Sequence, residues 1–171
     1  IMRNTLLPVI IVVGGFLTLT IPVFASTLYL TTPNSQVVVG QEFPVAIRLN
    51  IADQKVNAFS AYVSYPSDSL EVERIDPSGT FSISAEESIS DGEVKITKGN
   101  ISPVSGDNTV ATLIVKSKKA GSISLGFLTG SAVPSATDNS DTLTDNTSLT
   151  VSATGSSDNG GDQNNSVSNE H

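Results

Sequence analysis

Residues 42–72 read EFPVAIRLNIADQKVNAFSAYVSYPSDSLEV and contain two runs in which apolar and polar side chains alternate. The apolar positions of the first run are Phe43, Val45, Ile47, Leu49 and Ile51, and those of the second run are Phe59, Ala61, Val63 and Tyr65. A period of two is the pattern of a strand with one buried and one solvated face. Pro66 and the polar residues after it predict a turn. Two long strands of this kind, in a chain without a strong helical period, predict a β-sandwich.

Short alternating segments with turn signals between them continue on both sides of these runs. Strands are predicted at residues 27–31, 36–39, 42–51, 58–65, 70–75, 81–85, 93–98, 109–117, 122–127 and 148–152. Polar connections are predicted at residues 99–108 and 132–146, with an irregular turn at 86–88. About nine or ten short strands, with few helix formers elsewhere, predict an all-β jelly-roll sandwich.

The two ends of the chain differ in composition from this body, residues 26–153. Residues 1–25 carry one basic side chain, Arg3, then a long apolar run and a small-residue cleavage site. This pattern predicts a secretory signal peptide; the alternative is an uncleaved membrane anchor. In either case the body is exported, to the medium or to the cell surface. Residues 154–171 are polar except for Val167, which predicts a flexible tail or linker.

The composition argues against several classes of function. Acidic residues outnumber basic ones, 17 to 9, and such a surface repels the phosphates of nucleic acid. The chain has no cysteine, and its single histidine, His171, lies at the end of the tail. A Ser-His-Asp triad in the folded body is therefore excluded. Glu71 and Glu73 fall on the polar phase of a strand, and adjacent Glu86 and Glu87 point apart, so we expect no enzymatic activity.

The order and spacing of several segments resemble those of the cohesin family. The matching segments are VGQEFPV at 39–45, VNAFSAYVSY at 56–65, LEV at 70–72, VATLIVK at 110–116 and GSISL at 121–125. The sequence departs from the family at Pro66, where an aspartate usually follows the tyrosine, and at residues 114–115, which replace the usual aromatic. The resemblance covers roughly residues 27–152.

This resemblance implies a jelly-roll sandwich of about nine strands, related to cellulose-binding modules. It also implies binding of a calcium-loaded dockerin on one sheet face. Where dockerins are absent, it implies a general surface-adhesion unit. The calcium in such a complex belongs to the dockerin.

The outer face of the second alternating strand is the predicted binding face. Ser60, Tyr62 and Ser64 alternate with its apolar residues and should point to solvent. With Asn100 and Ser102 of the following polar connection, they form the predicted site for a dockerin-like or other extracellular protein. An exposed tyrosine suits a protein interface. It also suits stacking on a polysaccharide, so a carbohydrate-binding module is the alternative, and a structural surface spacer is a third class.

Aromatic platforms for sugar binding are scarce in this chain. It has no tryptophan. Phe43, Phe59 and Phe127 fall on the apolar phase of their strands, so we expect them in the core. Tyr62 is therefore the one aromatic residue predicted to lie on the outer face of its strand.

The last polar connection offers oxygen ligands of the kind that calcium prefers. They are the carboxylates of Asp138, Asp141 and Asp145, with Asn139 and Asn146 between or beside them. The spacing lacks the glycine and the terminal glutamate of an EF-hand loop. A solvated acidic loop is the alternative to a metal site, and no other cofactor is expected.

Overall fold

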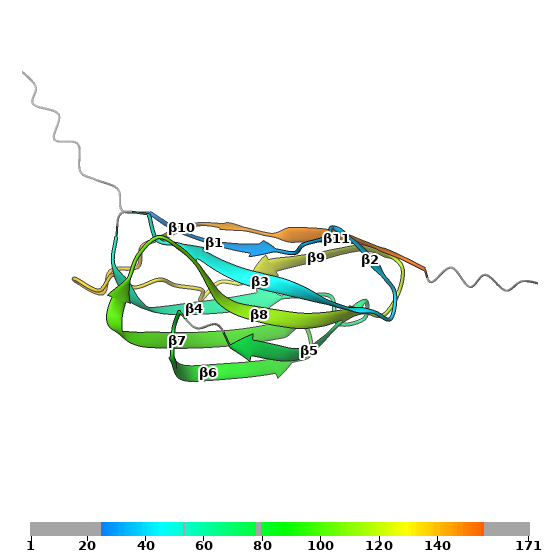
Figure 1. The fold of residues 1–171 in the computed structure, drawn as a ribbon, viewed down its shortest axis with the longest axis horizontal. Helices are drawn as coiled ribbons and strands as arrows, with labels where there is room; N and C mark the ends of the chain where they lie inside the picture. Colours follow the sequence, from blue (N-terminus) through cyan, green and yellow to red (C-terminus); the bar gives the residue numbers. More distant parts are fainter. Residues whose placement is uncertain (1–24, 53, 78–79, 156–171) are drawn as a thin grey trace, which may run out of the picture.

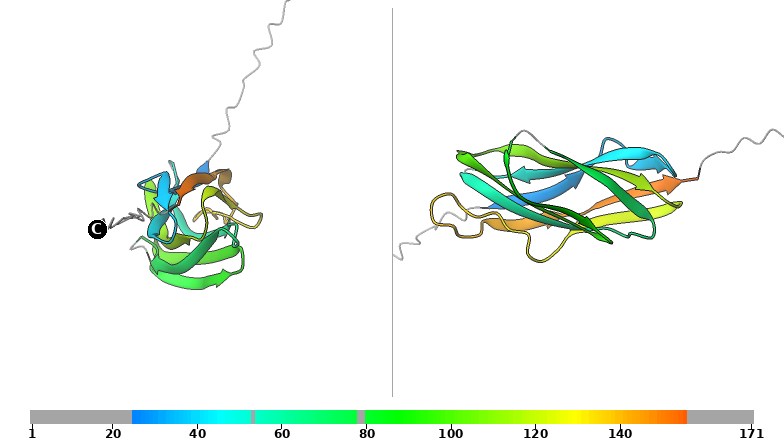
Figure 2. Two further views of the ribbon diagram at one scale, coloured as in Figure 1. Left: turned by 90° about the vertical axis from the view of Figure 1, so that its right-hand side faces the viewer. Right: turned by 90° about the horizontal axis from the view of Figure 1, so that it is seen from below.

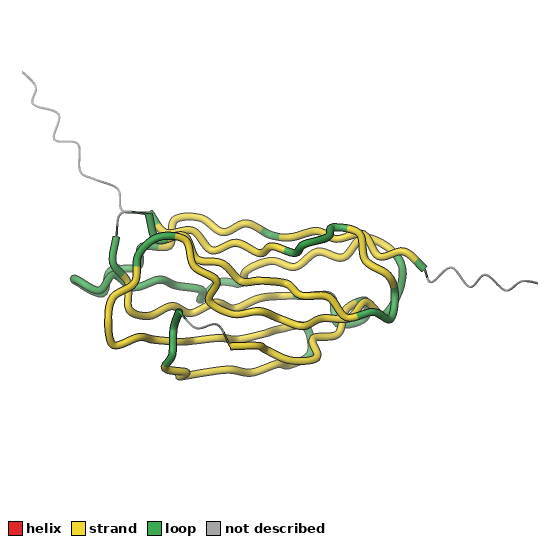
Figure 3. The backbone as a smooth tube through the Cα atoms, viewed as in Figure 1, coloured by secondary structure: helices red, strands yellow, loops and turns green. Residues whose placement is uncertain are grey.

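The computed structural model describes residues 25–52, 54–77 and 80–155, and within these ranges the chain forms strands and loops without a helix (Figures 1 and 3). The strands are β1 (Ser26–Thr31), β2 (Gln36–Val38), β3 (Glu42–Asn50), β4 (Val56–Ser64), β5 (Leu70–Pro77), β6 (Ile83–Ser90), β7 (Glu93–Val104), β8 (Asp107–Ser117), β9 (Gly121–Phe127), β10 (Leu143–Thr147) and β11 (Leu149–Thr154). None of the described segments is a helix of the length and apolarity needed to cross a membrane.

These strands form two sheets that face each other in a sandwich (Figure 2). One sheet has the order β10-β1-β3-β8-β5, and the other has the order β2-β11-β9-β4-β7-β6. Most neighbours are antiparallel, but β1 pairs with β10 and β11 pairs with β2 in parallel. The predicted all-β jelly-roll sandwich is confirmed. β1 begins at one end of the long axis of the sandwich, and β11 finishes at the other end (Figure 1).

The two alternating runs of residues 42–72 lie in different sheets and supply much of the core between them. Their fully buried members include Val45, Ile47 and Leu49 from β3, and Phe59, Ala61 and Val63 from β4. The rings of Phe59 and Phe81 meet edge to face, with centroids 5.0 Å apart. Burying one side chain of this size contributes about 1.5–3 kcal/mol. Phe59 is a core residue as predicted, whereas Phe43 and Phe127 are only partly buried.

Three predicted connections are wrong. Residues 99–108 are not a loop, because β7 continues to Val104 and β8 starts at Asp107. Gly106, with φ +79°, makes the short connection between them. The predicted turn at 86–88 lies inside β6, and the predicted connection at 132–146 contains β10.

β10, and the part of β6 beyond the predicted strand at residues 81–85, were missed for the same physical reason. β6 and β10 are edge strands, and most of their side chains are exposed on both faces. Such strands have no alternation of buried and solvated residues for a sequence pattern to detect. A bulge between Ser84 and Glu86 further interrupts the period of β6.

The predicted leader and tail lie almost wholly outside the described residues. Of these two segments the structure describes Ala25, Thr154 and Gly155, and Thr154 ends β11. Cleavage of the leader and flexibility of the tail therefore remain predictions.

Candidate partner-binding face

Three rows of side chains cross the outer face of β4, β7 and β6. The strand register forms them as Ser60–Thr97–Glu86, Tyr62–Lys95–Ser88 and Ser64–Glu93–Ser90. The alternate residues of β4 and β7 point into the core, where Phe59, Ala61, Val94 and Ile96 are buried. The period of two in β4 therefore places Ser60, Tyr62 and Ser64 together on one face, which we call the β4 face.

The ring of Tyr62 lies in a defined position at the centre of this face. The ammonium nitrogen of Lys95 lies 5.5 Å from the ring centroid, a distance that permits a cation–π interaction. On another side, a Cβ added to Gly130 would lie 3.0 Å from Cδ2 and Cε2 of the ring. The backbone of Tyr62 is also held, since Leu128 N–H donates to its carbonyl oxygen at 2.7 Å. An aromatic side chain fixed in this way loses little further entropy on binding a partner.

The two serines on either side of Tyr62 have partners within the protein. Ser60 Oγ lies 3.0 Å from Thr97 Oγ1, and Ser64 Oγ donates to the carbonyl oxygen of Gly126 at 3.3 Å. Each hydroxyl still has a free acceptor site for a partner. Both serines are half-buried, so they contribute a flat polar surface beside the Tyr62 ring.

Asn100 and Ser102 lie on β7 beyond its regular pairing. Val56 pairs with Val104 and Ala58 pairs with Gly99, so residues 100–103 bulge out of the ladder. Asn100 Oδ1 accepts a hydrogen bond from Ser82 Oγ at 3.2 Å. The two residues therefore occupy a strand bulge where a loop was predicted, and the register does not bring them into a row with Ser60, Tyr62 or Ser64.

Three side chains on this face were not predicted from sequence. Lys95 neighbours Tyr62, Ile83 is 49% exposed beside Gly99, and Ile101 is 87% exposed at the bulge. Ile83 lies two rows of the register away from Tyr62, and exposed isoleucines on the same sheet as an ordered tyrosine are typical of an interaction surface. The isolated isoleucine in the polar segment NISP was a signal for Ile101. Ile83 lies in the predicted strand at residues 81–85, and nothing in that short segment indicated that its side chain is exposed.

The predicted calcium ligands serve the loop itself. Asp138 accepts from Ser140 Oγ at 2.7 Å and from Ser140 N–H at 3.1 Å, and these bonds lower its pKa. Asp141 Oδ1 accepts from the N–H groups of Val133 at 2.9 Å and Leu143 at 3.0 Å.

The third predicted ligand, Asp145, belongs to β10 and pairs with Thr27. Among the described residues there is no group of three or more acidic or histidine side chains placed to hold a metal ion. The structure therefore does not bring Asp138, Asp141 and Asp145 together as a calcium site.

The carboxylate pairs are separated by the strand register. Glu86 faces outward with Thr97, whereas Glu87 forms an ion pair with Lys98. Glu73 lies 3.9 Å from Lys116 on the surface, and Glu71 is exposed. Neither pair has the shared cleft of a glycoside hydrolase.

No protein-family model matches the sequence, and a search of curated proteins finds no match. Solved structures do match. A cohesin module from a Clostridium perfringens family 33 glycoside hydrolase is 18% identical, with a TM-score of 0.65, and the match covers 78% of this chain and 98% of that one. A non-cellulosomal cohesin from the archaeon Archaeoglobus fulgidus is 18% identical, with a TM-score of 0.64 and coverage of 76% and 91%. This domain has the cohesin fold.

The cohesin resemblance stated from sequence is thereby confirmed for the fold. A further neighbour belongs to a type I cohesin–dockerin complex from Clostridium thermocellum, at 13% identity, a TM-score of 0.66 and coverage of 77% and 95%. The cohesin-like domain thus has the architecture of modules that have been solved both alone and with a dockerin.

Proposed function

We propose that this cohesin-like domain is an exported, non-catalytic module that attaches a dockerin-type or other extracellular protein. The β4 face is the proposed contact surface. The observation that carries the proposal is the ordered ring of Tyr62 between Lys95 and Gly130, at the centre of a sheet face in a cohesin fold. Dockerin binding by a structural neighbour supports the class of partner.

The physical character of the face also supports protein binding. Strands β4 and β7 hold its side chains on a rigid sheet, so little conformational entropy is lost on association. Tyr62 offers an aromatic anchor, and Ile83 and Ile101 offer apolar contact. Lys95 and the neighbouring Glu93, 3.7 Å apart, offer charges of both signs. A flat mixed surface of this kind suits a folded protein better than a single small molecule.

The arrangement of the ends supports a module that connects other parts. β1 begins at one end of the sandwich and β11 finishes at the other (Figure 1). A module with this geometry can stand in line between a cell-surface anchor on one side and a linker on the other. The same geometry would serve a structural spacer, so binding has to be tested directly.

The experiment is a pull-down with the full chain immobilised, against secreted proteins of its source organism, with and without calcium. We expect one or a few retained proteins that are released by chelator, because the calcium would be held by the partner. Retention of no protein would contradict the proposal.

Two tyrosine variants locate the surface. Tyr62→Ala should abolish retention. Tyr29→Ala is the matched control, since Tyr29 also lies under a cation, Arg48 at 5.9 Å, but on the other sheet. Equal loss in both variants would contradict the assignment of the β4 face. If no protein is retained and insoluble polysaccharide is bound through Tyr62, the face is a carbohydrate-binding one.

A further inference from the structure

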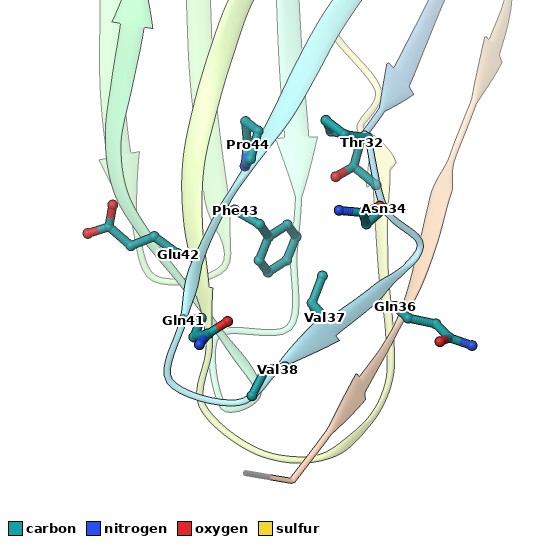
Figure 4. A pocket seen from close by; sticks show the side chains of 10 residues that line it. Thr32, Asn34, Gln36, Val37, Val38, Gln41, Glu42, Phe43 and Pro44 are labelled. Atoms are coloured by element: carbon teal, nitrogen blue, oxygen red, sulfur yellow. The ribbon is translucent and has the colours of Figure 1, made fainter. Parts of the chain in front are cut away.

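A pocket of about 380 Å³ lies away from the β4 face, at the mouth of the sandwich between β2 and the start of β3 (Figure 4). β2 is the edge of one sheet and β3 belongs to the other, so the pocket opens where the two sheets separate. The pocket falls within the size range of small-ligand sites.

Figure 4 shows the ring of Phe43 at the centre of this pocket, with Thr32 and Asn34 on one side and Val37 and Gln41 on the other. Phe43 occupies the inward phase of β3, but it is only partly buried because the sheets have begun to separate. The ring therefore presents an apolar platform to the pocket instead of being covered by the opposite sheet.

The polar groups around the ring lack internal partners. Thr32 Oγ1 is buried and makes no hydrogen bond with any described residue. Within the described part of the chain, no side-chain hydrogen bond involves Asn34 or Gln41 either, although both line the pocket. The Thr32 hydroxyl has no accessible surface, so a ligand in the pocket meets the exposed carboxamides of Asn34 and Gln41 instead.

The charge of the pocket restricts its ligand. Glu42 is the only charged residue that lines it, and Figure 4 shows its side chain directed outward. There its carboxylate pairs with Arg74 at 3.4 Å. With no cation in the lining, the pocket has nothing to neutralise a phosphate, a sulfate or a sugar acid.

Three backbone N–H groups beside the pocket are already hydrogen-bonded. Val39 N–H donates to Thr154 at 2.9 Å, Gly40 N–H donates to Ser117 at 2.9 Å, and Gln41 N–H donates to Val38 at 3.2 Å. At this end of the pocket a ligand is therefore recognised through side-chain amides and the Phe43 ring.

We propose that this pocket binds a neutral hexopyranose unit of a polysaccharide. The C–H face of such a sugar is apolar and packs on an aromatic ring, while its hydroxyls both donate to and accept from carboxamides. Phe43 supplies the ring, and Asn34 and Gln41 supply the carboxamides. The site is separate from the β4 face, so protein attachment and sugar binding are independent.

The test is a titration of the ¹⁵N-labelled full-length chain, followed by NMR, with cellobiose as the neutral probe and glucuronic acid as the acidic one. We expect cellobiose to shift the amide signals of residues 32–44 and glucuronic acid to bind more weakly. No shift with cellobiose, or equal binding of the two sugars, would overturn the proposal.

Three variants make the test specific. Asn34→Ala and Gln41→Ala should each raise the dissociation constant for cellobiose about fivefold, the effect of one hydrogen bond. Gln36→Ala is the matched control, because Gln36 lies at the rim with its side chain directed away from the ring in Figure 4. Equal affinities in the three variants would overturn the proposal.

Discussion

Lys98 Nζ lies 2.5 Å from Glu87 Oε1, although the Lys98 side chain is only 2% exposed. Lys98 pairs with Phe59 across the ladder and shares its inward direction. Glu87 reaches inward from the edge strand β6 and keeps 34% of its side chain exposed. The core of this sandwich therefore ends, on the β6 side, in an ion pair that closes it from solvent.

Removing Glu87 should cost more than removing Lys98, because only the Lys98 side chain is buried. Glu87→Gln should lower the free energy of unfolding by about 2 kcal/mol, because the Lys98 ammonium then remains buried without its counter-charge. Lys98→Met should be nearly neutral, since it replaces the charge with an apolar chain of similar length. Urea denaturation of both variants and of the double variant measures this. A Glu87→Gln variant as stable as the wild type would show that the pair carries little energy.

The same pair should protect the free edge of β6. Inward-pointing charges and bulges on edge strands prevent pairing between molecules, and β6 has both, together with the exposed Ile83 and Ile89. We expect Glu87→Val combined with Lys98→Met to fold and to self-associate more than Lys98→Met alone. Light scattering after size-exclusion chromatography distinguishes the two variants. Identical masses at all concentrations would contradict this role of Glu87.

Asp107 should make stability depend on pH at the acid end. It accepts hydrogen bonds from Tyr29 Oη at 2.6 Å and from Arg48, and these hold its pKa below the usual value. The unfolded chain therefore takes up this proton first, near a pKa of about 3.9. The stabilisation is present above that pH and disappears as the pH falls through the lowered folded pKa. Because Asp107 is 43% exposed, solvent screens the effect and keeps it small.

The Asp107→Asn variant tests this contribution of Asp107 to the pH dependence of stability. It should be less stable than the wild type at neutral pH, and the two should converge as the pH is lowered below about 4. Urea denaturation over a pH series follows the difference in unfolding free energy. A difference that stays constant down to the most acidic pH would assign the loss to packing instead of charge.

Gly130→Ala should disturb the β4 face. Gly130 has φ +103°, and its added Cβ would lie 3.0 Å from the ring of Tyr62. Gly106→Ala is the control, with φ +79° and no atom within 4 Å of the added Cβ. The control should lose about 1 kcal/mol from backbone strain alone, whereas Gly130→Ala should lose more and change the near-ultraviolet circular dichroism of tyrosine. Equal losses with unchanged tyrosine signals would mean that the ring moves freely.

Chelation of divalent metals should leave the melting temperature of this chain unchanged. The oxygens of Asp138 and Asp141 are engaged by Ser140, Val133 and Leu143, so their loop is ordered without an ion. Calorimetry with and without EDTA measures this directly. A fall in melting temperature on chelation would restore the interpretation of this loop as a calcium site.

Some of the candidate site was readable from the chain and some was not. The alternation of Ser60, Tyr62 and Ser64 predicted that they share a solvated face, because neighbouring residues in a strand point to opposite sides. The neighbours of Tyr62 could not be predicted from the sequence. Lys95 is brought to it by the pairing of β4 with β7, and Gly130 belongs to a loop that is distant in the sequence. Sequence spacing carries no information on such contacts.

The sequence alone determined the class of fold and its central strands, because a period of two over residues 42–51 and 58–65 has one physical solution, a strand with one buried face. It also located the residues of β4 that face outward. Only the tertiary structure decided the edge strand β10 and the full extent of β6, because most of their side chains are exposed and follow no period. The tertiary structure also decided the Lys98–Glu87 ion pair and the partial exposure of the Phe43 ring. Both depend on where one sheet stops covering the other.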